Sequence, residues 1–260
     1  MFLGEPPPTQ GDLHFRAFGF PVRVHPFLWV STLLLGMGGG EADPVETLIW
    51  IGVVFVSILV HELGHAFMQR RYGGRPWVTL YGLGGLASCN DCDRSPRAQI
   101  IIALAGPVAG FLLALVVVLL TKLSGHAIGF TRSKDAINLG SIGVDRVLIQ
   151  PLMAFFAYFE PFASRPLNHV LADLLQVNIL WGLVNLLPVY PLDGGRIARE
   201  LFTLGNPRQG IVQSLQLSAG VAALIAVYAV MRQEWFLCLM FGLLAYGSYQ
   251  ALQAYRNHWR

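Results

Sequence analysis

The residues with the clearest capacity for chemistry are two histidines and a glutamate in the segment His61–His65, whose sequence is HELGH. Residues four apart share one face of a helix, so His61 and His65 can place two imidazole nitrogens on one metal ion. Glu62 is the next residue round the helix, close to a metal-bound water and free to accept its proton. This arrangement is typical of zinc hydrolases, in which two histidines bind the metal and a carboxylate activates water.

The composition indicates an integral membrane protein. Hydrophobic residues make up 54% of the chain and charged residues only 13%, and the mean hydropathy is +0.54. A soluble domain carries about a quarter charged residues. Ionisable groups inside a membrane span are costly and mark functional sites, which favours a metal site over a hydrogen-bonded histidine pair. The net charge of +3 is too small to suggest binding to nucleic acid.

Apolar runs predict an all-α polytopic membrane protein with about six transmembrane helices in a lipid bilayer. The runs cover 47–67, 99–120, 167–187, 209–231 and 235–252, with a shorter one at 27–37. Residues 1–12 have no apolar core of a removable signal peptide, so the first span would direct the chain to the membrane. We expect one domain over 1–260, with a core at 15–200 and two further spans within 205–252.

Two segments are expected to be extended rather than helical. Residues 13–24 alternate loosely and contain the turn signal Gly19-Phe20-Pro21, which predicts a short β-hairpin at the membrane surface. Residues 72–87 are rich in glycine and β-formers, which predicts a hairpin or a re-entrant extended segment. The second segment could offer a free strand edge to an extended peptide, and a tight turn packed on the bundle fits equally well.

The connection at 121–166 has a charged half and an aromatic half. The charged residues are Arg132, Lys134, Asp135, Asp145 and Arg146, and the aromatic residues are Phe155, Phe156, Tyr158, Phe159 and Phe162. We expect the aromatic half to form a helix that lies in the membrane interface. A connection of about 45 residues is too short for an inserted domain of typical size, so no PDZ insertion is expected.

Two of the three cysteines form a CxxC motif, Cys89 and Cys92. A structural zinc site needs four ligands, and no second cysteine pair or His partner lies nearby. The motif also lacks a thioredoxin-like context. We therefore expect neither a disulfide framework nor metal or redox chemistry from these cysteines.

The run 167–187 is the most polar of the spans, and its polar residues are Asp173, Gln176, Asn178 and Asn185. A helix marked in this way must face the interior of the bundle. Asn178, Gly182 and Asn185 follow at spacings of four and three, so they form one narrow stripe. The helix with HELGH has a similar stripe, made of Ser57, His61, Gly64 and His65. We expect the two stripes to pack together.

The positively charged residues predict the orientation. With six crossings and an inside amino terminus, twelve lie on the cytoplasmic side: Arg16, Arg23, Arg70, Arg71, Arg75, Arg94, Arg97, Arg196, Arg199, Arg208, Arg256 and Arg260. The other side holds six: Lys122, Arg132, Lys134, Arg146, Arg165 and Arg232. This bias supports the topology and places His65 and Asp193 at the same, cytoplasmic face.

A catalytic zinc needs a third protein ligand and an open position for water. The carboxylates expected at the face of His65 are Asp193, Glu200, Asp91 and Asp93. Asp193 follows a turn fixed by proline and precedes two glycines, so its loop can fold back towards the helix ends. Asp91 and Asp93 lie in a loop that carries arginines, where we expect them to remain solvated. Asp193 is therefore the favoured third ligand.

These residues resemble the motifs of site-2 proteases, the intramembrane zinc metalloproteases. HELGH matches the family's HExxH, and residues 185–194, NLLPVYPLDG, match its NxxPxxxxDG. The glycines of 82–85 and the run Ala105-Gly106-Pro107 are also similar to the family's. The resemblance covers roughly residues 15–200 and implies the same polytopic helical fold.

The resemblance implies one Zn²⁺ per chain, bound by His61, His65 and Asp193. It implies that Glu62 is the general base and that Asn185 helps to stabilise the oxyanion. The substrate of this family is a transmembrane helix of a membrane-anchored regulatory protein, and the site would face the cytoplasmic side of the cell (inner) membrane. No CBS domains are expected at the carboxyl end.

Two alternatives remain open, and the oligomeric state is not predicted. A multi-pass metal transporter or metal-sensing protein could use the same His/Asp cluster, although Glu62 would then have no distinct task. A membrane protease of the CaaX-processing type also carries HExxH, but its third ligand is a glutamate. Zinc content in variants of Asp193 and Glu200 would distinguish the two protease classes.

Overall fold

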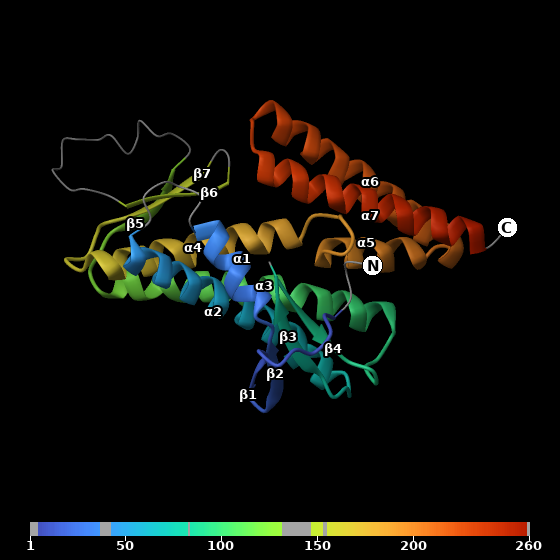
Figure 1. Cartoon of the computed structure of the whole chain (residues 1–260), viewed down its shortest axis with the longest axis horizontal. Helices are drawn as coiled ribbons and strands as arrows, with labels where there is room; N and C mark the ends of the chain where they lie inside the picture. Colours follow the sequence, from blue (N-terminus) through green and yellow to red (C-terminus); the bar gives the residue numbers. More distant parts are fainter. Residues whose placement is uncertain (1–4, 37–42, 83, 132–146, 153–154, 259–260) are drawn as a thin grey trace.

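The computed structural model describes residues 5–36, 43–82, 84–131, 147–152 and 155–258. Within them, five helices are long and apolar enough to cross a membrane. They are α2 (Pro44–Arg71), α3 (Pro96–Leu123), α4 (Arg165–Asn185), α6 (Pro207–Met231) and α7 (Trp235–His258). Figure 1 shows these helices running roughly along the long axis of the molecule. The predicted polytopic helical fold is therefore confirmed.

The long helices α2, α3, α4 and α6 begin in the same way. A polar side chain accepts a hydrogen bond from the first turn, and a proline follows within two residues; the capping residues are Asp43, Ser95, Ser164 and Asn206. Such caps satisfy backbone N–H groups that have no partner within the helix, and proline is tolerated where no N–H is needed. In α3, Pro107 lies in the interior, and the helix continues through it.

About six spans are expected, and the described residues contain five helices of sufficient length and one shorter apolar helix. The short run forms α1 (Phe27–Gly36), which has ten residues. At 1.5 Å per residue it extends about 15 Å, half of the roughly 30 Å hydrocarbon core of a bilayer. An eleven-residue helix, α5 (Asp193–Thr203), follows the loop after α4. The result is five long helices and two short ones.

Both predicted hairpins are present, and together they form one four-stranded sheet. The strands are β1 (Leu13–Ala17), β2 (Phe20–Val24), β3 (Trp77–Tyr81) and β4 (Gly84–Ser88), in the order β1-β2-β3-β4. The hairpins are antiparallel, whereas β2 and β3 pair in parallel, with Val22 opposite Val78. Phe20, Val22 and Val24 point inward from β2 and pack in a core with α1 and α2.

The aromatic half of the connection 121–166 is a strand, so the expected interfacial helix is wrong. A second sheet contains β5 (Ile128–Thr131), β6 (Val147–Leu152) and β7 (Phe155–Phe159), in the order β5-β7-β6. Ala157 and Phe159, two residues apart, are buried against α3 and α4. A period of two is that of a strand, not of a helix. The charged half, 132–146, lies outside the described residues.

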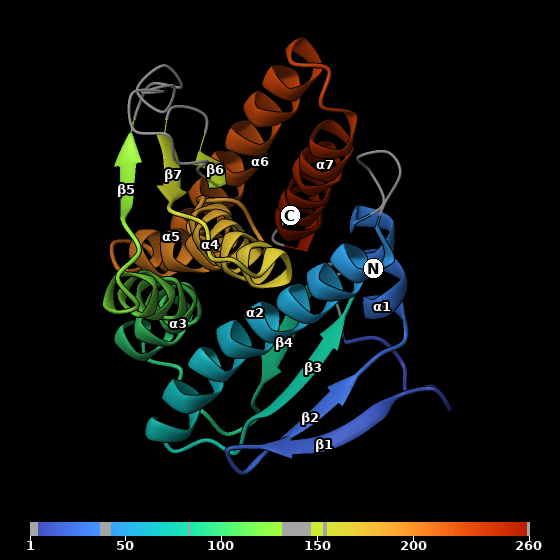
Figure 2. The same cartoon turned by 90° about the vertical axis from the view of Figure 1, so that its left-hand side faces the viewer.

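Helices α2, α3 and α4 pack on one another, and their small residues let α3 approach both partners (Figure 2). A Cβ at Gly64 of α2 would lie 2.8 Å from Ala109 Cβ of α3, and one at Gly182 of α4 would lie 2.8 Å from Phe111 Cζ. Asn178 Nδ2 of α4 donates to Ser57 Oγ of α2 at 2.9 Å. The two polar stripes therefore meet as expected, but the glycines serve the contacts with α3.

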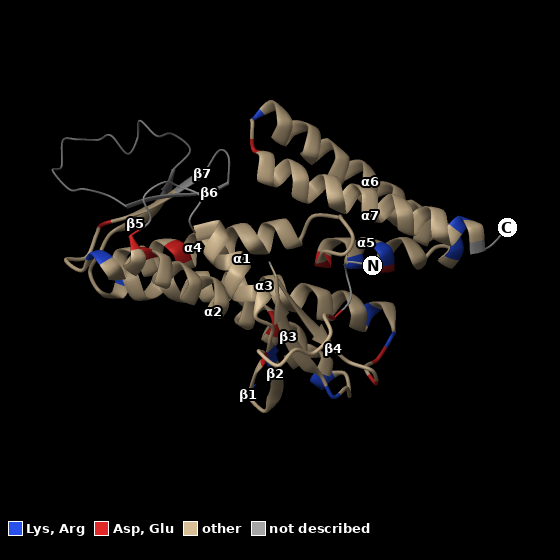
Figure 3. Ribbon diagram, in the orientation of Figure 1, with Lys and Arg blue, Asp and Glu red and all other residues tan. Residues whose placement is uncertain are grey.

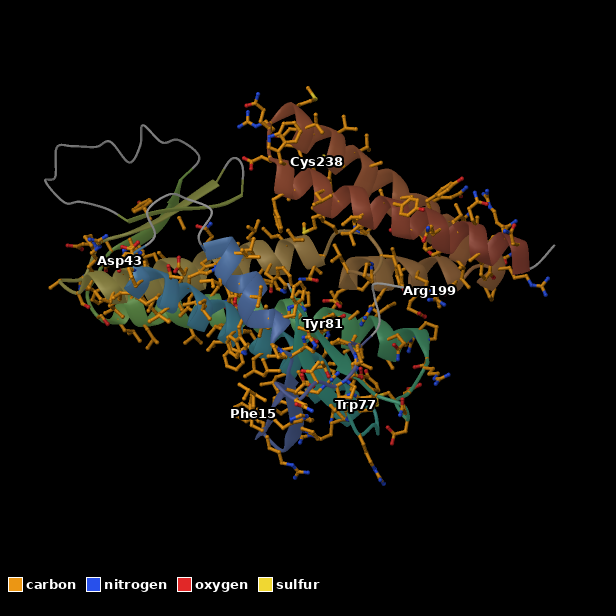
Figure 4. All side chains as sticks on the ribbon, viewed as in Figure 1. Phe15, Asp43, Trp77, Tyr81, Arg199 and Cys238 are labelled. Atoms are coloured by element: carbon orange, nitrogen blue, oxygen red, sulfur yellow. A yellow bond between two sulfur atoms is a disulfide. The ribbon has the colours of Figure 1, made fainter. Side chains whose placement is uncertain are left out.

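On the long helices the charged residues lie mainly near the ends, and others lie on α5, on the four-stranded sheet and in the loops (Figure 3). In Figure 4, Asp43 at the start of α2 is labelled near one end of the molecule, and Arg199 on α5 is labelled on the other side of its centre. The antiparallel hairpin of α6 and α7 packs on α5 and carries many exposed apolar side chains, among them Leu224, Val227 and Leu243. This distribution suits helices whose middle portions face lipid.

Candidate metal centre

Three donor atoms from distant parts of the chain converge beside the carboxyl-terminal third of α2. His61 Nε2 and His65 Nε2 lie 3.1 and 3.2 Å from Asp193 Oδ2, and the two imidazole atoms are 3.2 Å apart. All three side chains are buried. In the part of the chain that the structure describes, these three residues are the one group of His, Cys, Asp or Glu side chains whose donor atoms are close enough to hold a metal ion.

The hydrogen bond at the back of His65 decides which of its nitrogens faces the centre. His65 Nδ1 lies 2.7 Å from the carbonyl oxygen of Ile102 in α3. A carbonyl can only accept, so Nδ1 carries the proton and Nε2 of the neutral ring presents its lone pair. That lone pair then faces Asp193 Oδ2, another acceptor. Two acceptors at 3.2 Å repel each other unless a proton or a metal cation lies between them, and a metal bound by all three side chains would supply the cation.

Gly106 of α3 leaves space beside the two imidazoles. A Cβ at this position would collide with His65 Nε2 and lie 2.7 Å from His61 Nε2. The absent side chain thus preserves a small volume next to both donor atoms. Two imidazoles and one carboxylate are also a ligand set that suits zinc. The donor chemistry and the free volume both fit a bound Zn²⁺.

Asp193 reaches the centre because two glycines follow it at the start of α5. A Cβ at Gly194 would collide with the carbonyl of Leu186, and one at Gly195 would lie 2.5 Å from Tyr190 N. The first turn of α5 therefore packs directly on the loop before it. Burial raises the pKa of the Asp193 carboxyl, whereas a positive charge beside it, on a protonated His65 or His61 or on a bound cation, lowers that pKa below its ordinary value. The group is held as a carboxylate, the form that binds a metal.

Glu62 lies on α2 beneath the edge strand β4. It is 6% exposed, and a Cβ at Gly85 of β4 would lie 2.9 Å from its carboxyl group. Gly85 therefore lets the strand approach the carboxylate, a function that the glycine-rich sequence alone did not indicate. Tyr81, at the end of β3, lies within electrostatic reach of the same group. Burial raises the pKa of Tyr81, Glu62 raises it further, and Arg196 opposes both.

Figure 4 labels Tyr81 near the middle of the molecule and Trp77 farther out on the same strand. Tyr81 is paired with Gly84 across the β3–β4 hairpin. The hairpin therefore brings a phenol to the neighbourhood of Glu62. The sequence predicts a hairpin or re-entrant segment here, with a free strand edge or a tight turn, and gives Tyr81 no role. The signal available was Tyr81 itself, a polar aromatic residue directly before the glycine-rich turn.

Asn185 ends α4 and is nearly buried, at 8% exposed. Its Nδ2 donates to the carbonyl oxygen of Trp181, one turn earlier, at 2.9 Å. In this arrangement one N–H of the amide is bonded within its own helix. Nδ2 carries a second N–H, which a role towards a substrate could use.

The other candidate carboxylates are not members of the converging group. Asp91 Oδ1 accepts from the Arg75 N–H at 2.9 Å, and Asp93 Oδ1 accepts from the Ser95 N–H at 2.7 Å. Both belong to the loop between β4 and α3. Glu200 lies seven residues beyond Asp193 on α5. The geometry therefore agrees with Asp193 as the third ligand and not with Glu200.

Cys89 and Cys92, which follow β4, are joined by a disulfide, and Cys238 is free. The bond was not predicted from the sequence. A Cβ at Gly74 would collide with both sulfur atoms, and Gln69 Nε2 donates to the carbonyl of Ala87 at 2.9 Å. The disulfide thus lies where the end of α2 meets the end of β4.

Comparison with known proteins agrees with this site. The chain is 31% identical over 235 residues to the putative zinc metalloprotease Rip3 of Mycobacterium tuberculosis. The aligned region covers 81% of this chain and 51% of Rip3. It is 24% identical over 234 residues to zinc metalloprotease MJ0392 of Methanocaldococcus jannaschii. That aligned region covers 89% of this chain and 53% of MJ0392. The chain thus spans about half the length of these relatives.

A solved structure has the same fold. The site-2 protease from Methanocaldococcus jannaschii superimposes with a TM-score of 0.57 and 19% identity, covering 93% of this chain and 95% of that one. The family model described as Peptidase family M50 matches residues 49–227, which include HELGH, Gly106 and Asp193. The chain belongs to peptidase family M50.

Proposed function

We propose that this protein is a zinc metalloprotease that hydrolyses a peptide bond within a transmembrane segment of a membrane-anchored protein. The observation that carries the proposal is the convergence of His61, His65 and Asp193 beside Glu62, on helices long and apolar enough to cross a membrane. Membership of peptidase family M50 and the names of the relatives support the same activity.

The proposal gives each buried polar group of the site a role. His61, His65 and Asp193 hold one Zn²⁺, and Ile102 orients His65 through its carbonyl. When bound, the zinc polarises the substrate carbonyl and lowers the pKa of a water to about 7. Glu62 takes the proton from that water and delivers it to the leaving amine, as a general base and then a general acid.

Asn185 is the proposed hydrogen-bond donor to the oxyanion. Its Nδ2 lies at the end of α4 and carries a second N–H besides the one bonded to Trp181, and this second N–H would donate to the developing oxyanion. A donor of this kind contributes about 3 kcal/mol to transition-state stabilisation.

The free edge of β4 is the proposed binding surface for the scissile segment. In the order β1-β2-β3-β4, β4 has a neighbouring strand on one side, and Gly85 lies directly against Glu62. A helical substrate must unwind before its carbonyl can be attacked. Lipid cannot satisfy the backbone groups that this exposes, whereas an added strand on β4 can.

The membrane placement follows from the helices and the charges. Arg70 and Arg71 end α2, and Arg196 and Arg199 lie on α5, which begins with Asp193. Positive residues favour the cytoplasmic side of a membrane. The active site is therefore proposed to open towards the cytoplasm, with the bilayer around the five long helices.

The decisive test separates proteolysis from metal transport. The full chain and Glu62→Gln are reconstituted with single-span membrane proteins as candidate substrates, and zinc content and cleavage are measured for both. The proposal predicts that Glu62→Gln retains zinc and loses cleavage. Cleavage that survives this substitution would contradict the mechanism. Zinc flux into vesicles that persists in Glu62→Gln, without cleavage by the wild-type protein, would support a transporter.

A further inference from the structure

The start of α5 does not by itself fix the position of Asp193. Its N-cap residue, Leu192, makes no side-chain capping hydrogen bond. The Leu192 N–H donates to the Val189 carbonyl within the loop itself at 2.8 Å, and three residues before Asp193 the loop is hydrogen-bonded to other helices, at Tyr190. The Tyr190 N–H donates to Ser218 Oγ of α6 at 2.7 Å, and Ser248 Oγ of α7 donates to the Tyr190 carbonyl at 3.3 Å. The loop backbone is thus tied to both helices of the carboxyl-terminal hairpin.

The two serines complete a closed ring of hydrogen bonds. Ser218 Oγ and Ser248 Oγ are 2.7 Å apart. Each hydroxyl has one proton. Ser248 donates its proton to the Tyr190 carbonyl, so Ser218 must be the donor to Ser248 and the acceptor from the Tyr190 N–H. All three bonds then run in one direction, and removing either hydroxyl breaks the ring.

Apolar contacts hold the same loop against the hairpin. Val189 is fully buried and packs with Ala222 of α6 and Phe241 of α7. On the other side of the loop, a Cβ at Gly195 would lie 2.5 Å from Tyr190 N. The hairpin therefore contacts the loop, and the loop contacts the first turn of α5, which carries Asp193.

We infer that Ser218 and Ser248 are positioning residues for the third metal ligand. They hold the backbone of Tyr190 so that the Asp193 carboxylate reaches His61 and His65. The inference rests on the proposed function, in which Asp193 binds zinc. Both serines are 1% exposed, so their loss leaves backbone groups without a partner in an apolar environment, and the loop must shift to satisfy them.

The test measures zinc affinity of the purified full chain by competition with a chelator. Loss of a residue that orients a metal ligand weakens binding roughly 10- to 100-fold. We expect a loss in this range for Ser218→Ala and for Ser248→Ala, and no further loss in the double variant, because one substitution already opens the ring. Ser218→Thr keeps the hydroxyl and is expected to bind zinc like the wild type.

Ser214 provides the matched control. It lies one turn earlier on α6, is also buried, and donates its hydroxyl to the carbonyl of Ile211 in its own helix. Ser214→Ala should leave the zinc affinity unchanged. Absorption of Co²⁺ bound in place of zinc gives a second readout, which should change in Ser218→Ala and not in Ser214→Ala.

The possible outcomes are distinguishable. If Ser218→Ala and Ser248→Ala lower only the unfolding temperature of the metal-free protein, and match Ser214→Ala in zinc affinity and Co²⁺ spectrum, the positioning role is overturned. If Ser218→Ala does not fold, Ser248→Ala decides by the same criteria. It leaves the bond from the Tyr190 N–H to Ser218 in place and removes the bond to the Tyr190 carbonyl. Asp193→Ala tests the proposed metal site separately from the positioning role of the serines. If this variant binds zinc like the wild type, the proposed metal site itself is wrong.

Discussion

The core of α2, α3 and α4 and the hairpin of α6 and α7 are built from similarly apolar helices, and both bury neutral polar side chains, but among the described residues only the core buries ionisable ones. The core helix α2 buries His61, Glu62 and His65, all ionisable. The hairpin buries Ser214, Ser218 and Ser248, whose hydroxyls are neutral. Hydropathy alone does not separate the two regions. The kind of polar group they bury does.

The difference indicates how each region contributes to the site. Ionisable side chains within lipid are retained where they bind an ion or move a proton. Neutral hydroxyls cost less to bury and can join two backbone segments. In the proposed mechanism the core therefore supplies the chemistry, and the hairpin restrains the loop that carries Asp193.

The largest effect is expected from removing a proposed ligand in the core. Asp193→Ala should lower zinc affinity by more than the roughly 100-fold typical of an outer-shell partner, and abolish cleavage. The measurements are zinc content after dialysis and cleavage of a membrane-embedded substrate. Glu200→Ala, on the same helix α5, is the control and should retain zinc. Equal zinc loss in both variants would argue against Asp193 as the ligand.

The space beside the imidazoles can be tested with two glycines one turn apart on α3. A Cβ at Gly106 would collide with His65, whereas one at Gly110 would lie at an ordinary 3.5 Å from Asn178 Oδ1. Overpacking costs about 1–3 kcal/mol, or roughly 5- to 150-fold in zinc affinity. Gly106→Ala should show such a loss by chelator competition. Gly110→Ala should bind zinc normally, and a similar loss there would show that the effect is not local.

A second glycine pair compares the core with the hairpin directly. A Cβ at Gly64 of α2 would lie 2.8 Å from Ala109 Cβ, whereas one at Gly220 of α6 has nothing within 4 Å. Gly64→Ala should destabilise the protein by about 1–3 kcal/mol. Gly220→Ala should be neutral or stabilise it by up to about 1 kcal/mol. Unfolding in detergent measures both, and equal destabilisation would remove the distinction between the two regions.

The smallest effect is expected at the hydrogen bond between α2 and α4. Asn178 Nδ2 donates to Ser57 Oγ at 2.9 Å, one turn of α2 before His61. Interhelical hydrogen bonds in membrane proteins contribute about 0.6 kcal/mol on average. A double-mutant cycle of Ser57→Ala and Asn178→Ala should give a coupling energy of this size. A coupling of zero would mean that the stripes pack without help from this bond.

Local patterns predicted much of the fold and the candidate site. The long helices were predicted because apolar length is visible in one stretch of sequence, and HELGH and Asp193 because their residue types suit one metal. The strand Phe155–Phe159 was mistaken for a helix, because aromatic residues fit either element and its burial depends on α3 and α4. Nothing local shows that β2 pairs in parallel with β3.

The contact of Gly106 with the imidazoles and the contribution of the two serines were not predicted. Each depends on a partner far along the chain: Gly106 on the imidazoles of α2, and Ser218 and Ser248 on Tyr190. A buried glycine or serine in an apolar helix has no signature of its own. Its partner is known only when the helices are packed.

The most direct test of the central claim is X-ray absorption at the zinc edge on the purified, zinc-loaded protein. Binding by His61, His65 and Asp193 predicts two imidazole nitrogens and at least one oxygen at about 2.0–2.2 Å from zinc. In Asp193→Ala this set should be lost. A sulfur neighbour at about 2.3 Å, as expected if Cys89 and Cys92 bound the metal, or an unchanged spectrum in Asp193→Ala, would contradict the account.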